Sequence, residues 1–304
     1  MHSAKTEALD LTQEGLQQLE PGLQAKFSSL VEWLRARGRV LIALSGGVDS
    51  SFLAAAARIA LADRAVVVTA DSVTLPPGEL SEAKKLASSL GLRQVVVKEN
   101  ELQDERFALN PPDRCYYCKM GLIKELRKVA AQEGIDVILD GTNADDLKGH
   151  RPGALALREG GVRSPLAELG FTKNEIRAIS KALGLPTWSK PSMACLSSRF
   201  EYGQRITAEG LHRVGEAESF IRTLTGVRQL RVRCHGELAR IEVGKDERSL
   251  LADEDIMDRV SEKLRALGFR YVTLDLTGYR TGSMDEALAQ PIIPEKMTAN
   301  RSAR

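Results

Sequence analysis

Two cysteines, Cys115 and Cys118, stand within one turn of each other in the stretch "DRCYYCKM", residues 113–120. Thiols at this spacing can form half of a zinc site, a redox-active disulfide or a pair of iron–sulfur ligands. They can also be two unconnected cysteines. The pair by itself does not distinguish these four alternatives, so the choice depends on the rest of the sequence.

A phosphate-binding turn is the strongest local pattern in the chain. In "IALSGGVDSSFLA", residues 42–54, an apolar strand runs into two glycines, and a helix begins near Asp49. Paired glycines let the backbone approach an anion closely, and a helix start offers free N–H groups and a positive dipole end. A capped turn without a ligand is the alternative. We predict that the loop binds phosphate through Ser45, Gly46, Gly47, Val48, Asp49, Ser50 and Ser51.

The loop lacks the Gly-Lys-Ser/Thr ending of a Walker-type loop. An aspartate among phosphates would repel them unless it bound a cation, so we predict that Asp49 lies near Mg²⁺. A second polar turn, "LDGTNADD" at residues 139–146, ends a later strand. An Asx or Thr cap explains about half of that turn, so its role stays open at this point.

A third thiol, Cys195, lies in the irregular stretch "KPSMACLSSRF", residues 190–200. A cation close to this thiol would lower its pKa and make it nucleophilic. The alternative is a small buried apolar side chain. Arg199, four residues later, is a candidate for binding an anionic substrate.

Two arginines follow in the stretch "QLRVRC", residues 229–234. Arg231 and Arg233 are two residues apart on a predicted strand, so both project from one face of it. Two guanidinium groups on one face suit a phosphate or a carboxylate. The alternatives are a solvated strand face and, for one of the arginines, an ion pair with Glu242 on the neighbouring strand.

These residues need elements to position them. Apolar runs predict strands at 39–44, 65–70, 93–98 and 135–143, and helical patterns occur at 51–61, 81–91 and about 119–132. Alternating strands and helices predict a parallel sheet covered on both faces, which binds ligands at the carboxyl ends of its strands. The cysteine pair would lie in a loop at this edge.

The pattern changes beyond residue 204. Helices are predicted at 207–224 and 247–267, with strands at 229–234, 238–243 and 271–278. We therefore expect an α/β domain at residues 20–204, a small α+β domain for substrate binding or oligomerisation at 205–287, and a flexible tail at 288–304.

Composition limits the possible partners. The chain has 304 residues, a formal net charge of +2 and four cysteines. The low net charge makes binding to nucleic acid or to an acidic membrane an unfavoured expectation. No apolar run approaches the ~20 residues that cross a bilayer, and the first residues lack the apolar core of a secretory signal. We expect a cytoplasmic protein.

The string "SGGVDSS" resembles the PP-loop of the ATP pyrophosphatase superfamily, which has an adenine nucleotide alpha hydrolase-like fold. The resemblance implies cleavage of Mg-ATP to AMP and pyrophosphate, with adenylation of a carbonyl or carboxylate oxygen. It also implies that Asp71 and Ser72 lie near the adenosine. Gly141 and Thr142 would face the nucleotide, with Asp145 beside Mg²⁺.

Further motifs narrow the resemblance. Together with "SGGVDSS", the strings "RCYYCK", "LDGTNADD", "SPLAELGFTKNEIRAISKALGLPTWSKPSMACLSSR" and "DLTGYRTGSM" resemble the ATP-dependent sulfur transferases that help build the nickel-pincer nucleotide cofactor of lactate racemase. The resemblance implies that a carboxylate of pyridinium-3,5-biscarboxylic acid mononucleotide is adenylated and converted to a thiocarboxylate. Arg231, Arg233 and Arg199 would bind this substrate. We also expect a sulfide donor as partner and a homo-oligomer.

Members of that family obtain sulfur in two ways. In some, the cysteine that matches Cys195 gives up its own sulfur. In others, three cysteines hold a [4Fe–4S] cluster whose fourth iron carries sulfide. This chain has the triplet Cys115, Cys118 and Cys195, so we predict a cluster, with these three residues as the catalytic thiols. Structural zinc normally needs four ligands. Cys234 is interpreted as a bystander.

Other functions remain as alternatives. A tRNA thiolase shares the loop and the use of three cysteines, but no RNA-binding module is recognisable in the chain. An amidotransferase would need a source of ammonia, and no glutaminase domain is recognisable. A non-catalytic nucleotide or sulfur-carrier binder would leave the three thiols unexplained.

Overall fold

A computed structural model describes residues 9, 13–147 and 152–280, so the predicted tail at 288–304 lies outside the described residues. Four strands form one sheet in the order β3-β2-β1-β4, and every pair in it is parallel. The α/β prediction for this part of the chain is confirmed. The strands are β1 (Val40–Ala43), β2 (Ala65–Ser72), β3 (Arg93–Glu99) and β4 (Ile138–Leu139).

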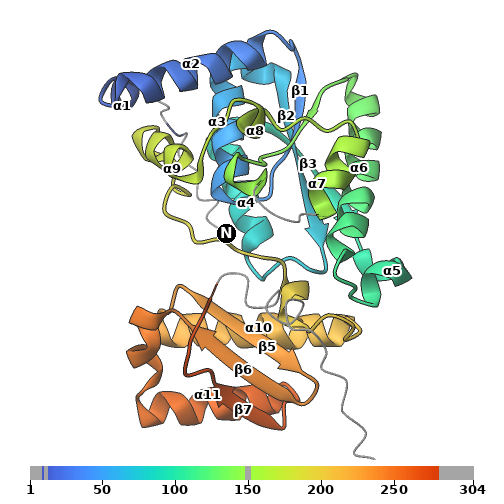
Figure 1. Cartoon of the computed structure of the whole chain (residues 1–304), viewed down its shortest axis with the longest axis vertical. Helices are drawn as coiled ribbons and strands as arrows, with labels where there is room; N and C mark the ends of the chain where they lie inside the picture. The colour runs from blue at the N-terminus through green and yellow to red at the C-terminus, as the bar shows by residue number, and fades with distance from the viewer. Residues whose placement is uncertain (1–8, 10–12, 148–151, 281–304) are drawn as a thin grey trace, which may run out of the picture.

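Helices cover both faces of this sheet (Figure 1). Val40 and Ile42 of β1 join a core with α2, α3 and α9 on one face, whereas Leu41 joins a core with α6 and α7 on the other. This double burial explains why the strands read as continuous apolar runs. The helices of this part are α1 (Gln13–Gln17), α2 (Pro21–Arg35), α3 (Val48–Leu61), α4 (Glu79–Ser89), α5 (Glu105–Ala108), α6 (Arg114–Glu133), α7 (Pro152–Glu159), α8 (Pro165–Glu168) and α9 (Lys173–Ala182).

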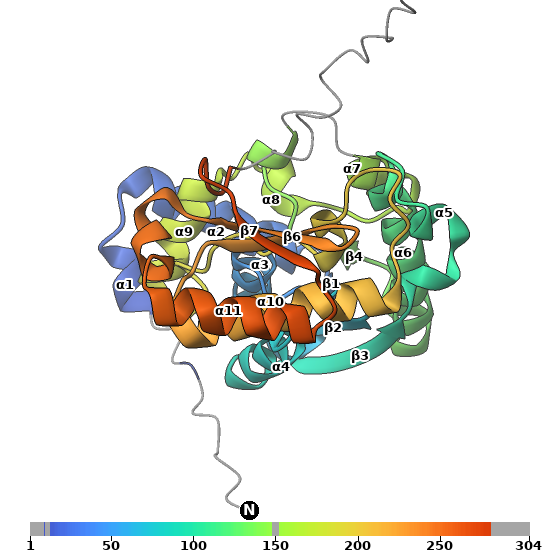
Figure 2. The same cartoon turned by 90° about the horizontal axis from the view of Figure 1, so that it is seen from below.

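A second sheet follows, with β5 and β6 antiparallel and β7 parallel to β6 (Figures 1 and 2). Its core also contains Phe107, Leu196 and Phe200, which precede the expected boundary at 204. The division of the chain into domains therefore stays a prediction. The elements are α10 (Ala208–Thr225), β5 (Leu230–His235), β6 (Leu238–Val243), α11 (Glu254–Ala266) and β7 (Tyr271–Leu274).

Local predictions were wrong in four places. The predicted strand 271–278 and the predicted helix 247–267 are both shorter in the structure, as β7 and α11. The fourth strand is shorter than the predicted range 135–143, because the polar groups that follow Leu139 bond to side chains and to a neighbouring segment instead of a strand ladder. The cysteine pair lies on a helix, since α6 begins at Arg114 with Asp113 as its N-cap. Among the described residues, no helix is both long and apolar enough to cross a membrane.

Candidate active site

The phosphate loop joins β1 to α3 at the carboxyl edge of the parallel sheet. Gly46 has a left-handed φ of 75°, which glycine adopts without strain, and Gly47 is the N-cap of α3. The hydroxyl oxygens of Ser45 and Ser50 lie 3.0 Å apart, and Ser51 Oγ donates to the Gly47 carbonyl at 2.7 Å. Val48 is the first helical residue. The first N–H groups of α3 are thereby presented at the sheet edge, where an anion can accept their hydrogen bonds.

Gly141 packs directly against this loop. A Cβ atom placed on Gly141 would stand 2.7 Å from the amide nitrogen of Ser50 and 3.1 Å from the carbonyl carbon of Asp49. Both neighbours are backbone atoms, so no side chain fits at this position. The turn after β4 and the loop after β1 therefore form one surface.

Asp49 and Asp145, the two predicted Mg²⁺ ligands, both contact Lys173. The Lys173 ammonium forms an ion pair with Asp49 Oδ2, and the Lys173 backbone N–H donates to Asp145 Oδ2 at 2.9 Å. Asn143 Nδ2 also donates to Asp49 Oδ1, at 3.3 Å. The structure thus brings together carboxylates from two strand ends around the first residue of α9.

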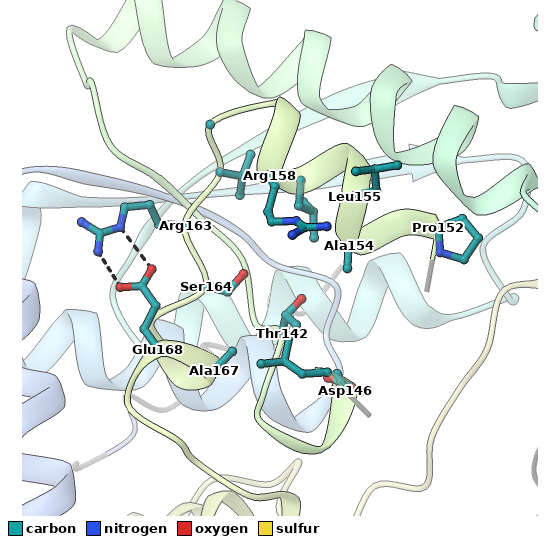
Figure 3. Close-up of a pocket in the computed structure, with 14 residues that line it drawn as sticks. Thr142, Asp146, Pro152, Ala154, Leu155, Arg158, Arg163, Ser164, Ala167 and Glu168 are labelled. Atoms are coloured by element: carbon teal, nitrogen blue, oxygen red, sulfur yellow. Dashed lines mark hydrogen bonds and ion pairs between the residues drawn. The ribbon is translucent and has the colours of Figure 1, made fainter. Parts of the chain in front are cut away.

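A cavity of about 800 Å³ lies beside the turn after β4 (Figure 3). Thr142 and Ser164 line it, and both donate their hydroxyl hydrogens to the buried carboxylate of Asp140. Figure 3 shows the Arg158 side chain extending into the cavity toward Thr142. Thr142 therefore lies between the phosphate loop and an open cavity that is lined by the positively charged side chain of Arg158.

Asp71 and Ser72 end β2 at the same sheet edge, with Asp71 exposed. Ser72 Oγ and Thr74 Oγ1 both donate to the same oxygen of Glu101, which is 6% exposed. The other oxygen of Glu101 is buried without a hydrogen-bond partner among the described residues. The Ser72 hydroxyl is thus already engaged inside the protein, whereas the Asp71 side chain faces solvent.

The thiols come from two segments that meet beside this network. Cys115 and Cys118 are the second and fifth residues of α6, and Cys195 precedes the short 3₁₀ turn Leu196–Arg199. The Leu196 N–H donates to the Thr74 carbonyl at 2.8 Å, which attaches the Cys195 segment to the end of β2. Cys115 is exposed, whereas Cys118 and Cys195 are half-buried.

Electrostatics disfavour the thiolate form of Cys118. Burial raises the pKa of this thiol well above its usual value, and the nearby Cys195 and Glu101 raise it further. Burial and the neighbouring Glu101 raise the pKa of Glu99 to about 7. The surroundings of Cys118 are therefore acidic, which is the opposite of the electropositive setting that activates a thiol.

Metal binding by the thiols is not evident from their placement. In the ranges 13–147 and 152–280, no group of three or more Cys, His, Asp or Glu side chains could hold a metal ion. The donor types suit an iron–sulfur cluster, but Cys115, Cys118 and Cys195 are not grouped in this structure so that they could hold one metal ion together. Mg²⁺ needs fewer protein ligands, since it is usually held by one or two carboxylates together with substrate phosphates and water.

The three predicted substrate arginines are buried rather than facing solvent. Arg199 is 1% exposed and forms a bidentate ion pair with Glu218. Arg233 is 6% exposed, and its Nε and Nη2 both donate to one carboxylate oxygen of Glu242. For Arg233, the structure therefore shows the alternative to substrate binding, an ion pair with Glu242 on the neighbouring strand. Arg199 and Arg233 thus use most of their donors inside the protein.

Arg231 differs from the other two arginines. It is 3% exposed, donates to the carbonyls of Leu230 and Ser192, and stacks over the Tyr279 ring at 5.0 Å. Within the described part of the chain, no carboxylate lies at ion-pair distance from it. Burial and the positive charge of Arg199 lower the pKa of Arg231 to about 10. A buried cation without a direct ion-pair partner attracts an anion.

Comparison with known proteins identifies the family. A family model described as asparagine synthase, a PP-loop domain, matches residues 25–189. The pyridinium-3,5-bisthiocarboxylic acid mononucleotide synthase of Lactiplantibacillus plantarum is 37% identical over 270 residues, which cover 88% of this chain and 96% of that protein. The chain belongs to this PP-loop synthase family.

Two other relatives are similar to this chain. An uncharacterized protein of Synechocystis is 42% identical over 268 residues, covering 88% of this chain and all of that protein. A glutamine-hydrolyzing GMP synthase chain of Methanococcus maripaludis is 32% identical over 181 residues, covering 55% of this chain and 56% of its own length. As a member of the synthase family, the protein is an enzyme.

Sequence reasoning missed four residues that build this candidate site. Lys173 joins the two aspartates, Glu218 holds Arg199, and Glu101 lies under Ser72. Asn110, with a left-handed φ of 55°, accepts from Arg114 of α6 and donates to the Glu201 carbonyl, so it ties the cysteine helix to the chain after Cys195. Only Lys173 carried a signal, because it follows Thr172 in the capping box that starts α9.

Proposed function

We propose that the protein is an ATP-dependent sulfurtransferase that converts a carboxylate of pyridinium-3,5-biscarboxylic acid mononucleotide into a thiocarboxylate, as a step in making a nickel-pincer cofactor. One observation carries the proposal: the similarity to the synthase named above extends over 88% of this chain. The adjacency of a phosphate loop and thiols at one sheet edge supports it.

The first step is adenylation. A substrate carboxylate oxygen attacks the α-phosphorus of ATP, the bond to the bridging oxygen breaks, and pyrophosphate leaves. The N–H groups at the start of α3 and the Lys173 ammonium stabilise the charge that develops on pyrophosphate. Asp49 and Asp145 would hold Mg²⁺, with the phosphates as its remaining ligands. The Lys173–Asp49 ion pair then exchanges for contacts with phosphate and metal.

The second step is sulfur transfer. A sulfur nucleophile attacks the carbonyl carbon of the acyl adenylate, and AMP leaves with the electron pair of the C–O bond. Cys195 lies on the segment attached to the end of β2, next to the predicted adenosine contacts, which is where an acyl adenylate would present its carbonyl. We propose that Cys115, Cys118 and Cys195 hold a [4Fe–4S] cluster, which would supply an open iron for sulfide. Sacrifice of the Cys195 sulfur is the alternative.

The substrate phosphate is proposed to bind Arg231. Among the described residues, this arginine is the member of the predicted clamp that has no carboxylate at ion-pair distance, so a phosphate dianion gains the most there. Arg233 and Arg199, whose charges are paired with Glu242 and Glu218, contribute to the electric field around the phosphate without bonding to it directly.

The test is pyrophosphate release. Purified protein with Mg-ATP should release pyrophosphate only when the pyridinium biscarboxylate nucleotide is added, and anaerobic sulfide should then give the thiocarboxylate by mass spectrometry. Asp49→Asn should abolish release, while Asp63→Asn, an exposed aspartate beyond α3, should behave as wild type. Release without the nucleotide, or dependence on tRNA together with a tRNA gel shift, would overturn the assignment.

A further inference from the structure

The segment that carries Cys195 is held by arginines instead of by a strand ladder. Arg231 donates to the Ser192 carbonyl at 2.8 Å, and Arg233 donates to the Ser198 carbonyl at 2.7 Å. Arg199 donates to the carbonyls of Ala194 and Cys195, at 2.8 and 3.0 Å. The residues predicted to clamp a substrate therefore all hold one stretch of backbone, residues 192–198.

Arg199 makes the contacts closest to the thiol. Its Nη1 reaches the Ala194 and Cys195 carbonyls and, at 2.9 Å, the Ser198 hydroxyl. Its Nε and Nη2 donate to the two carboxylate oxygens of Glu218, both at 2.8 Å. One guanidinium thus serves five acceptors and has little capacity left for a substrate anion.

Glu218 fixes the orientation of that guanidinium. It is 1% exposed on α10 and also accepts from the Val232 N–H of β5 at 2.9 Å. Arg222, one turn further along α10, donates to the same carboxylate at 3.0 Å. Because a planar guanidinium bonded in bidentate fashion cannot rotate freely, the carboxylate determines where Nη1 points.

We propose that Arg199 and Glu218 are positioning residues for Cys195. The pair fixes the backbone on both sides of the thiol from the α10 side of the molecule, and neither residue binds the nucleotide. Only the turnover measurement below rests on the proposed function. The placement of the Cys195 backbone does not depend on which substrate the enzyme uses.

The experiment measures the alkylation rate of each cysteine in the native full-length protein, by iodoacetamide and peptide mass spectrometry. The variants are Arg199→Lys, which keeps the charge but loses the planar fork, and Glu218→Gln, which keeps the shape but loses the charge. Arg222→Lys is the matched control, because Arg222 bonds the same carboxylate but has no hydrogen bond to residues 192–198. Cys234 is 3% exposed in β5 and reports unfolding.

In both variants we expect Cys195 to react about five-fold faster or more, because local opening of its segment no longer costs the arginine contacts. Cys118 and Cys234 should keep their wild-type rates, and Arg222→Lys should match wild type. With ATP and the pyridinium nucleotide, kcat should fall about ten-fold while the KM of the nucleotide changes less than about two-fold.

Unchanged Cys195 reactivity in both variants overturns the proposal, and so does a rise in nucleotide KM with kcat preserved, which is the signature of substrate binding. A variant in which Cys234 reacts as fast as Cys195 reports unfolding, and the other variant then decides. Unfolding of both refutes a separate positioning role. If the wild type releases no pyrophosphate, the proposed function fails while the alkylation result stands.

Discussion

The absence of a side chain at Gly141 lets the phosphate loop pack closely against the turn after β4. Its Cα faces the backbone of Asp49 and Ser50, so the start of α3 can approach the turn after β4 only because no Cβ atom intervenes. This contact sets the distance between the carboxyl ends of β1 and β4.

Replacing Gly141 with alanine should therefore destabilise the protein by about 1–3 kcal/mol, because two backbone segments must separate to admit the methyl group. Urea unfolding followed by circular dichroism measures the change. Gly22→Ala on α2 is the control, since a Cβ atom there meets nothing within 4 Å. Equal stability of the Gly141 and Gly22 variants would contradict the close contact.

A second residue, Glu99, makes stability depend on pH. Its pKa is raised to about 7 by burial and by Glu101, so the folded chain holds this proton more tightly than the unfolded chain does. The unfolded carboxyl titrates near 4.5, so stability should fall as pH rises from about 4.5 to about 7.

Glu99→Gln should remove this loss and be about 1–2 kcal/mol more stable than wild type at pH 8, with little difference at about pH 4.5. Thermal melting across pH measures it, and Glu262→Gln on the exposed face of α11 is the control. A pH-independent difference between Glu99→Gln and wild type would show that Glu99 acts through packing instead of charge.

The arginines show where residue-level reading of the sequence stops. Strand periodicity correctly placed Arg231 and Arg233 on one face, but it does not reveal what covers that face. The cover is the backbone of residues 192–198, whose carbonyls accept from both arginines. A strand pattern states which side chains share a side, whereas burial of that side is decided by a segment distant in sequence.

At the scale of elements, the two proposed sulfur sources differ in whether they need the start of α6. Cys115 and Cys118 both lie there, so the cluster hypothesis requires α6 and the Cys195 segment together. The sacrificial alternative requires Cys195 alone.

Cys115→Ser, Cys118→Ser and Cys195→Ser should each lose anaerobic, sulfide-dependent turnover if a cluster is present, because every thiolate is a ligand. Iron content and the absorption spectrum of anaerobically purified wild type supply a readout apart from activity. Full activity in Cys115→Ser, with wild type losing the mass of H₂S after one turnover, would exclude the cluster and identify Cys195 as the donor.

The start of α9 is a second functional element. The capping box of Thr172 and Glu175 begins the helix at Lys173, which places the lysine beside Asp49 although 124 residues separate them. No rule of sequence spacing connects residues so far apart, so only the folded structure reveals this contact.

Lys173→Met should lower substrate-dependent pyrophosphate release at least about 100-fold, because one preorganised cation is lost from the site of developing charge. The variant should fold normally, since the capping box is untouched and the pair is partly exposed. Lys181→Met at the other end of α9 is the control. Wild-type release in Lys173→Met would mean that the ammonium serves only to balance Asp49.

Over the whole molecule, the sequence predicted the order of strands and helices well because each buried strand is a short apolar run. It missed the length of β4 and the start of α6, where polar groups or a proline-rich approach obscure the boundary. It could not show that Leu196 and Phe200 join the core of the second sheet, since apolar residues in an irregular stretch carry no period.

Leu196→Ala should accordingly destabilise the chain by about 2–5 kcal/mol, as a large-to-small change in a filled core. Hydrogen exchange should show faster exchange in β5 and β6 together with residues 192–200, while β1 and β2 stay protected. Ala194→Gly in the same segment is a control that changes backbone freedom without removing a core side chain. Exchange confined to the segment would contradict a shared core.

This shared core affects how the protein loses activity when it begins to unfold. Leu196 and Phe200 depend on the second sheet, whereas the phosphate loop depends on the first. A chain whose second sheet melts early would keep its phosphate loop but would lose the proposed substrate contact at Arg231 and the arginine contacts to the segment that carries Cys195. Because pyrophosphate release is proposed to require bound substrate, mild heat or a destabilising mutation would then stop both steps while the parallel sheet is still folded. Pyrophosphate release, followed as temperature rises, should therefore decline before any loss of secondary structure in the parallel sheet.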